Sequence, residues 1–241
     1  MDATVVLVIS VRIIAAFQKD KEISYISHLD VQRTLQRAFR RADLPLSYTN
    51  GFNPHPKLSF ATALATGFSS SGEWIDLELD SDLDPQEFLK RVNAVLPSGL
   101  HFHTAFEADG SIDTLSKILS AATYALQLFP HTPVSIEQLR DALDSLLSEQ
   151  EIIVQKKTKG GIKPTNIRPE IIEAFVTETP DSILQIELTG SLTVSGGLRV
   201  ETFLSALFDR IGTTGFSEVH RISVCFTGTE KLPRLKYQKG L

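Results

Sequence analysis

The stretch SYTNGFNPHPKLSFATALATGFSSSGEWIDLEL, residues 47–79, decides how the first half of the chain folds. Its last part, EWIDLEL, alternates apolar and acidic residues with the period of a half-buried strand. Its centre, GFNPHPK, places His55 between two prolines. Each proline fixes its own φ and biases the preceding residue toward extended geometry. We therefore interpret residues 51–57 as a stiff segment that displays side chains.

The elements around this stretch predict a ferredoxin-like order. Ser27 and Asp30 form a capping-box pattern, and Asp84 stands before Pro85, so each pair marks the start of a helix. We expect helices at 28–42 and 85–95, and strands at 4–17, 46–49 with 57–61, 73–80 and 100–107. The resulting order is βαββαβ.

The same order of elements recurs in the second half, where Ser135 begins a helix and Gly212 ends another. We therefore predict an α+β protein of tandem ferredoxin-like halves with antiparallel sheets, at 1–110 and 121–241. The second half would carry a basic insertion at 156–174.

Composition excludes a membrane-spanning segment, an internal disulfide and a cysteine-bound cluster. The chain has 241 residues and a net charge of −5, and no apolar run reaches the roughly 18 residues of a membrane span. Cys225, the single cysteine, excludes an internal disulfide and a cysteine-bound cluster. We expect a cytoplasmic protein without a membrane contact, a cofactor or a metal.

Positive charge is segregated along the chain. Residues 12–57 carry eight Lys or Arg and four Asp or Glu, whereas residues 58–155 carry four basic and fifteen acidic residues. Residues 156–168 hold five basic residues and no acid, and residues 231–239 hold four and none. This distribution indicates local anion-binding surfaces despite the acidic total.

The first predicted helix has an arginine face. At 100° per residue its apolar residues gather on one side, and the opposite side carries Arg33, Arg37, Arg40 and Arg41. The face is either a solvated surface or an anion-binding site. Arginine suits phosphate because its planar guanidinium binds two oxygens at once.

His55 has three interpretations. It could act as a general base, contact a ligand beside Asn53 and Lys57, or be a rigid turn residue. No carboxylate partner is placed by the sequence. His28, at a helix start, could meet an anion or face solvent. His101 and His103 share a strand face, but a third metal ligand cannot be named.

Two further segments could hold phosphate. The Gly- and Ser-rich stretch 66–74 reads as a flexible loop and lacks the ending of a P-loop. The insertion reads as a mobile basic loop, and its candidate contacts are Lys156, Lys157, Lys159, Lys163 and Arg168.

These motifs resemble a known family. The HLD helix start at 28–30, the GFNPHPK segment and the GFSSSGE stretch at 67–73 are similar, in this order, to the bacterial radical SAM-linked protein family. The similarity extends over 23–107 and reappears at NIRP, residues 166–169. It implies a radical SAM protein with a cobalamin-binding domain as partner, and an RNA-related context. Without a cysteine triplet this chain would be the accessory half.

Three functions remain open at this stage. The chain could be an RNA-binding or substrate-presenting module, a ferredoxin-like RNA-processing or RNA-modifying enzyme with His55 or His28 as acid/base, or a structural assembly domain. A binding module needs only a contiguous basic surface, which the sequence supplies more clearly than a partnered catalytic base. We expect backbone contacts to dominate because aromatic residues are few.

Overall fold

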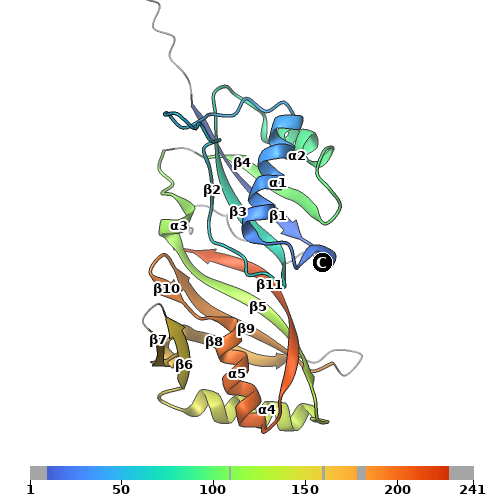
Figure 1. The fold of residues 1–241 in the computed structure, drawn as a ribbon, viewed down its shortest axis with the longest axis vertical. Coiled ribbons are helices and arrows are strands. Elements are labelled where there is room, and N and C mark those ends of the chain that lie inside the picture. The colour runs from blue at the N-terminus through green and yellow to red at the C-terminus, as the bar shows by residue number, and fades with distance from the viewer. Residues whose placement is uncertain (1–9, 109, 159–160, 178–182, 228–241) are drawn as a thin grey trace, which may run out of the picture. The chain divides into compact units, whose positions relative to one another are not determined.

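A computed structural model describes residues 10–108, 110–158, 161–177 and 183–227. By its contacts the chain divides into two compact units, one containing residues up to 118 and the other residues 119–227. Each unit combines an antiparallel sheet with helices (Figure 1), so the chain is a mixed α+β protein with few helices.

The first unit follows the expected sequence of elements. They are β1 (Val11–Lys19), a 3₁₀ turn η1 (Lys21–Ile23), α1 (His28–Arg41), β2 (Leu58–Phe60), β3 (Phe68–Leu79), α2 (Pro85–Asn93), β4 (Leu100–Glu107) and the short α3 (Leu115–Ile118). The strands pair antiparallel in the order β4-β1-β3-β2.

Both helix starts of the first unit are confirmed. The Ser27 side chain accepts a hydrogen bond from the backbone N–H of Asp30, and Asp84 accepts from Gln86 and Glu87. These bonds satisfy N–H groups that have no partner inside a helix. The sequence pattern therefore located α1 and α2 to within a residue or two.

Aromatic side chains form the centre of the first core. Phe39 from α1 and Phe88 from α2 both pack on Phe102 of β4, with ring centroids 6.0 Å and 5.6 Å apart. Phe17 of β1 approaches the same ring at 5.3 Å. Because all four are almost completely buried, α1 and α2 must present their apolar faces inward and their charged faces to solvent.

The second unit has a related arrangement with additions. Its elements are β5 (Leu119–Pro130), α4 (Ile136–Ser148), β6 (Ile153–Thr158), β7 (Gly161–Asn166), η2 (Arg168–Glu170), β8 (Ile171–Thr177), β9 (Gln185–Thr193), β10 (Gly196–Gly197), α5 (Val200–Ile211) and β11 (Gly215–Phe226). The sheet runs β11-β5-β9-β8, and β10 continues along the same partner, β9.

Strands β6 and β7 form a separate antiparallel ribbon. We expected the basic insertion to be a mobile loop, and this expectation was wrong for residues 156–158 and 161–166, which lie in the ribbon. The two segments pair with each other instead, and Asn166 fastens the base of the ribbon by accepting hydrogen bonds from the N–H groups of Ile152 and Arg168.

The Gly- and Ser-rich stretch is also not the predicted flexible loop. Strand β3 begins at Phe68, and Ser69 and Ser70 are buried within it. Ser70 lies opposite Lys19 of β1, so the backbone of this segment is fixed by the sheet. Residues 68–74 therefore form no loop that could wrap around a phosphate.

Candidate nucleic-acid interface

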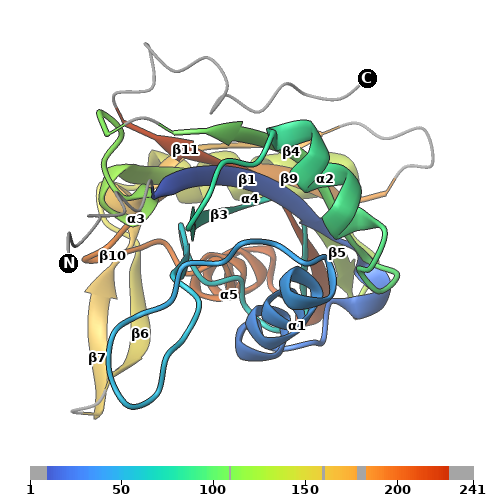
Figure 2. The ribbon, with the colours of Figure 1, turned by 90° about the horizontal axis from the view of Figure 1, so that it is seen from above.

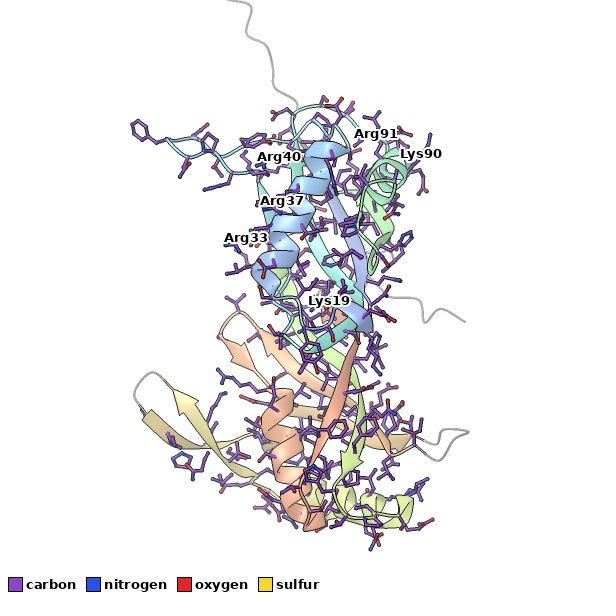
Figure 3. All side chains as sticks on the ribbon, turned by 45° about the vertical axis from the view of Figure 1, so that its right-hand side comes forward. Lys19, Arg33, Arg37, Arg40, Lys90 and Arg91 are labelled. Atoms are coloured by element: carbon purple, nitrogen blue, oxygen red, sulfur yellow. The ribbon has the colours of Figure 1, made fainter. Side chains whose placement is uncertain are left out.

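Three arginines form a stripe on the exposed face of α1. The helix buries Val31, Leu35, Ala38 and Phe39, which leaves Arg33, Arg37 and Arg40 in solvent. Figure 3 shows the three side chains following one another along the helix. Over seven residues an α-helix rises by about 10 Å, so the stripe presents three guanidinium groups over roughly that length.

The arginines differ in their partners. Arg33 forms an exposed ion pair with Asp30 at 3.0 Å, one turn away. Within the described part of the chain, Arg37 and Arg40 have neither an ion pair nor a hydrogen bond. The predicted fourth member, Arg41, donates to the carbonyl of Val95 at 2.6 Å. Arg41 therefore ties the helix to the segment after α2, and the stripe consists of Arg33, Arg37 and Arg40.

The basic residues of helix α2 are paired with a carboxylate on the same helix. Lys90 and Arg91 both face Glu87, at 3.6 Å and 2.8 Å. Hydrogen bonding from Arg91, followed by the charge of Lys90, lowers the pKa of the Glu87 carboxyl. These two cations are ion-paired with a carboxylate on their own helix, whereas Arg37 acts on Asp30 only through its charge.

Residues 47–57 form a projection that we call the finger. Leu46 bridges to Leu79 of β3, and Tyr48 bridges to Pro56 across the finger. The segment leaves the sheet on the same side of β1 as α1 (Figure 2). The predicted strand at 46–49 is thus reduced to isolated bridges, because residues 47–49 pair with residues 55–57 within the finger.

Backbone hydrogen bonds within the finger hold His55 between its two prolines. The carbonyl of His55 accepts a hydrogen bond from the N–H of Thr49 at 2.8 Å. The N–H of His55 donates to Thr49 Oγ1 at 3.0 Å. Pro54 and Pro56 have no N–H to satisfy, so His55 is the residue of the Pro-His-Pro segment whose N–H needs a partner, and Thr49 supplies it. The imidazole of His55 and the amide of Asn53 are both exposed.

Lys57 is placed differently from the rest of the finger. Its Nζ lies 2.6 Å from Glu78 Oε2, and this hydrogen bond is the main reason that the pKa of Lys57 is raised. The ammonium group is thus neutralised locally on the surface. Lys57 contributes less free positive charge to the finger than the sequence indicated.

The ribbon of β6 and β7 places two lysines directly opposite each other. Lys156 pairs in register with Lys163, and like charges at such positions repel. Arg168, by contrast, donates to the carbonyls of Leu147 and Ile171, so it fixes the fold of the second unit. Lys157 lies on the ribbon opposite Ile162, and Lys159 lies outside the described residues.

A buried charged cluster in the first unit was missed by sequence reasoning. Lys19 and Glu73 are 2% and 4% exposed, and they line a pocket together with His28. Lys19 donates to the carbonyls of Ser24 and Ile26, and burial lowers its pKa against the opposing effect of Glu73. The pocket has room for about one water molecule.

His28 is half-buried at this pocket, with its ring edge-on to Phe60 at 4.7 Å. Contact between His28 and an anion stays a prediction. His103 interacts with the carbonyl of Ser71 and with Thr104. Among the described residues no group of His, Cys, Asp and Glu could hold a metal ion. No described helix has both the length and the apolar character to cross a membrane.

A comparison with known protein families finds one that matches most of the chain. Residues 12–199 match the family described as "Uncharacterized protein conserved in bacteria (DUF2344)". The chain belongs to this family. No curated protein matches the DUF2344 chain.

One solved structure resembles the fold of the chain at low sequence identity, with a TM-score above 0.5. A chain of "Crystal Structure of a Cbf5-Nop10-Gar1 Complex" superposes with a TM-score of 0.54 at 11% identity, over 88% of this chain and 48% of that one. A chain of "Crystal structure of the archaeal box H/ACA sRNP Nop10-Cbf5 complex" reaches 0.48 at 10% identity, over 87% and 46%. The DUF2344 chain spans about half the length of these chains.

Proposed function

We propose that this DUF2344 protein is a non-catalytic RNA-binding module. The observation that carries the proposal is the α1 stripe, in which Arg37 and Arg40 are exposed and form neither an ion pair nor a hydrogen bond among the described residues. Guanidinium groups bind phosphate oxygens with charge-assisted, often bidentate hydrogen bonds. A row of such groups along a helix suits a polyanionic backbone better than a single small anion.

The acidic total of the chain does not oppose this proposal. Carboxylates elsewhere would repel a polyanion only weakly across distances beyond the Debye length, about 8 Å at physiological salt. The stripe itself contains one acidic neighbour, Asp30, at its beginning. Binding would therefore be local, dominated by backbone contacts and sensitive to salt.

The ribbon offers a second contact surface. An anion between Lys156 and Lys163 would relieve the repulsion between their charges. A two-stranded ribbon is also one of the elements that fit a nucleic-acid groove. Both lysines belong to the second unit, whereas the stripe belongs to the first.

We further propose that both units are ferredoxin-like, which makes the chain a tandem of this fold. In each unit the strand order is last, first, third, second, if the ribbon and β10 are set aside as additions. Two helices connect the strands in each case. Sheets of this kind commonly present RNA-binding surfaces, as in the RNA-recognition motif.

A radical SAM enzyme is the proposed protein partner. The support is the resemblance carried by the HLD, GFNPHPK and GFSSSGE segments, together with the single cysteine, which leaves the chain unable to hold a cysteine-bound cluster of its own. The module would then present RNA to that enzyme. An RNA-processing enzyme using His55 is less favoured, because within the described residues no carboxylate orients that imidazole.

A charge-reversal experiment tests the RNA proposal. The double variant Arg37→Glu and Arg40→Glu should weaken binding of a structured RNA at low salt at least tenfold, measured by filter binding. The matched control reverses Lys90 and Lys117, which are exposed and face acidic neighbours, and has the same net charge change. Equal losses in the two variants would contradict a specific role of the stripe.

A further inference from the structure

The finger carries a fully exposed phenyl ring at its tip. The relative exposure of Phe52 is 111%, the largest of any apolar side chain in the described residues. A phenylalanine that could bury 150–250 Å² is costly to leave in water. Gly51, just before it, has φ +126°, a conformation that L side chains rarely adopt, so the turn that projects the ring depends on glycine.

The ring is held on a preorganised support. Tyr48 and Pro56 bridge the two arms of the finger, and Thr49 bonds to both backbone groups of His55. The prolines reduce the freedom of the unbound segment still further. A ligand that covered the ring would therefore pay little additional ordering entropy, which is the usual advantage of a rigid recognition element.

The chemistry around the ring points to a base. Residues 47–56 contain no charged side chain apart from the titratable His55, and they offer the exposed amides of Asn50 and Asn53. Unpaired bases stack on aromatic rings, and amides supply both the donor and the acceptor that base edges need. The phosphates would be held by the stripe on α1, and the helix itself lies on the same side of β1 as the finger (Figure 2).

We propose that the finger recognises an unpaired RNA base, which stacks on Phe52 and is contacted at its edge by Asn50 or Asn53. This inference rests on the proposed RNA-binding function and adds to it a preference for single-stranded segments. A protein pocket that accepts a phenyl ring is the alternative occupant, and the experiment below separates the two.

Tryptophan fluorescence gives a direct readout. Trp74 is the only native tryptophan and is buried, so Phe52→Trp introduces the sole exposed indole. An oligonucleotide of unpaired bases should quench its emission, and a duplex of equal length should quench it much less. The control is Phe216→Trp in the second unit, an exposed position that the finger model does not involve, where no quenching is expected.

Affinity measurements complete the test. Phe52→Ala should weaken binding of the single-stranded oligonucleotide about tenfold, the effect of losing one stacked base, and leave duplex binding unchanged. Retained single-strand affinity in Phe52→Ala, without quenching in Phe52→Trp, would overturn the inference and favour a protein occupant. If Arg37→Glu with Arg40→Glu still weakened binding, the RNA function would stand; if wild type bound no RNA, both proposals would fail.

Discussion

At the scale of single residues, the most informative contact is an ion pair that joins β1 to β3. Arg12 donates through Nε and Nη2 to both oxygens of Asp76, at 2.8 Å and 2.5 Å, and also to the carbonyls of Ile112 and Asp113. The hydrogen bond to Asp76 is the main cause that raises the pKa of Arg12. The pair thus fastens the segment before α3 to the sheet.

Removing this arginine should destabilise the protein strongly. Arg12→Met leaves the nearly buried carboxylate of Asp76 without its partner, so the free energy of unfolding should fall by about 3 kcal/mol. Urea denaturation measures the change. Arg33→Met breaks an exposed pair and should cost about 0.5 kcal/mol or less. Similar losses in both variants would show that the Asp76 contact is unimportant.

His103 should make stability depend on pH. Desolvation is the first cause that lowers its pKa, and the charge of His101 adds to it, against a hydrogen bond with Ser71. A histidine with a lowered folded-state pKa contributes stability above its unfolded value near 6.5, and this contribution is lost as pH falls through the folded pKa. Wild type should therefore lose more stability between pH 7 and 5 than His103→Asn; parallel curves would rule this out.

At the scale of elements, the exposed side chain of His55 and the Thr49 hydrogen bond that holds its backbone can be tested separately. His55→Ala removes an exposed side chain and leaves its backbone bonds, so its melting temperature should match wild type. Thr49→Ala removes the acceptor of the His55 N–H and should cost about 1 kcal/mol. Thermal melting of both variants is sufficient. A larger loss in His55→Ala than in Thr49→Ala would make the histidine a structural residue.

The ribbon should show a conflict between stability and binding. Lys163→Glu replaces the repulsion across the strands by attraction to Lys156, which should raise stability by a few tenths of a kcal/mol. The same change should weaken RNA binding, because one phosphate contact is lost and one negative charge is added. Chemical denaturation and filter binding measure the two effects. Unchanged binding would remove the ribbon from the interface.

At the scale of the whole molecule, the sequence predicted elements better than it predicted contacts. The helix starts at Ser27 and Asp84 follow from local capping chemistry, and Gly212 ends α5 in the expected left-handed conformation. Local rules are sufficient there because each cap involves residues one turn apart.

Contacts between distant segments could not be predicted in this way. Arg41 and Arg168 are tied to backbone carbonyls, and the burial of Lys19 with Glu73 results from the pairing of β1 with β3. In the sequence these arginines look like free surface charges, and the lysine stands at the end of an apolar run. The site was therefore reduced from four helix arginines to three by tertiary structure alone.

The salt dependence of RNA binding tests the central claim most directly. For single strands, the slope of log K against log salt concentration changes by about 0.7 for each phosphate contact. We predict a steep negative slope for wild type, and a slope flatter by about 1.4 for Arg37→Glu with Arg40→Glu, because two contacts are lost. A slope equal to that of wild type in this variant, or no salt dependence in wild type, would contradict an α1 stripe that holds the RNA backbone.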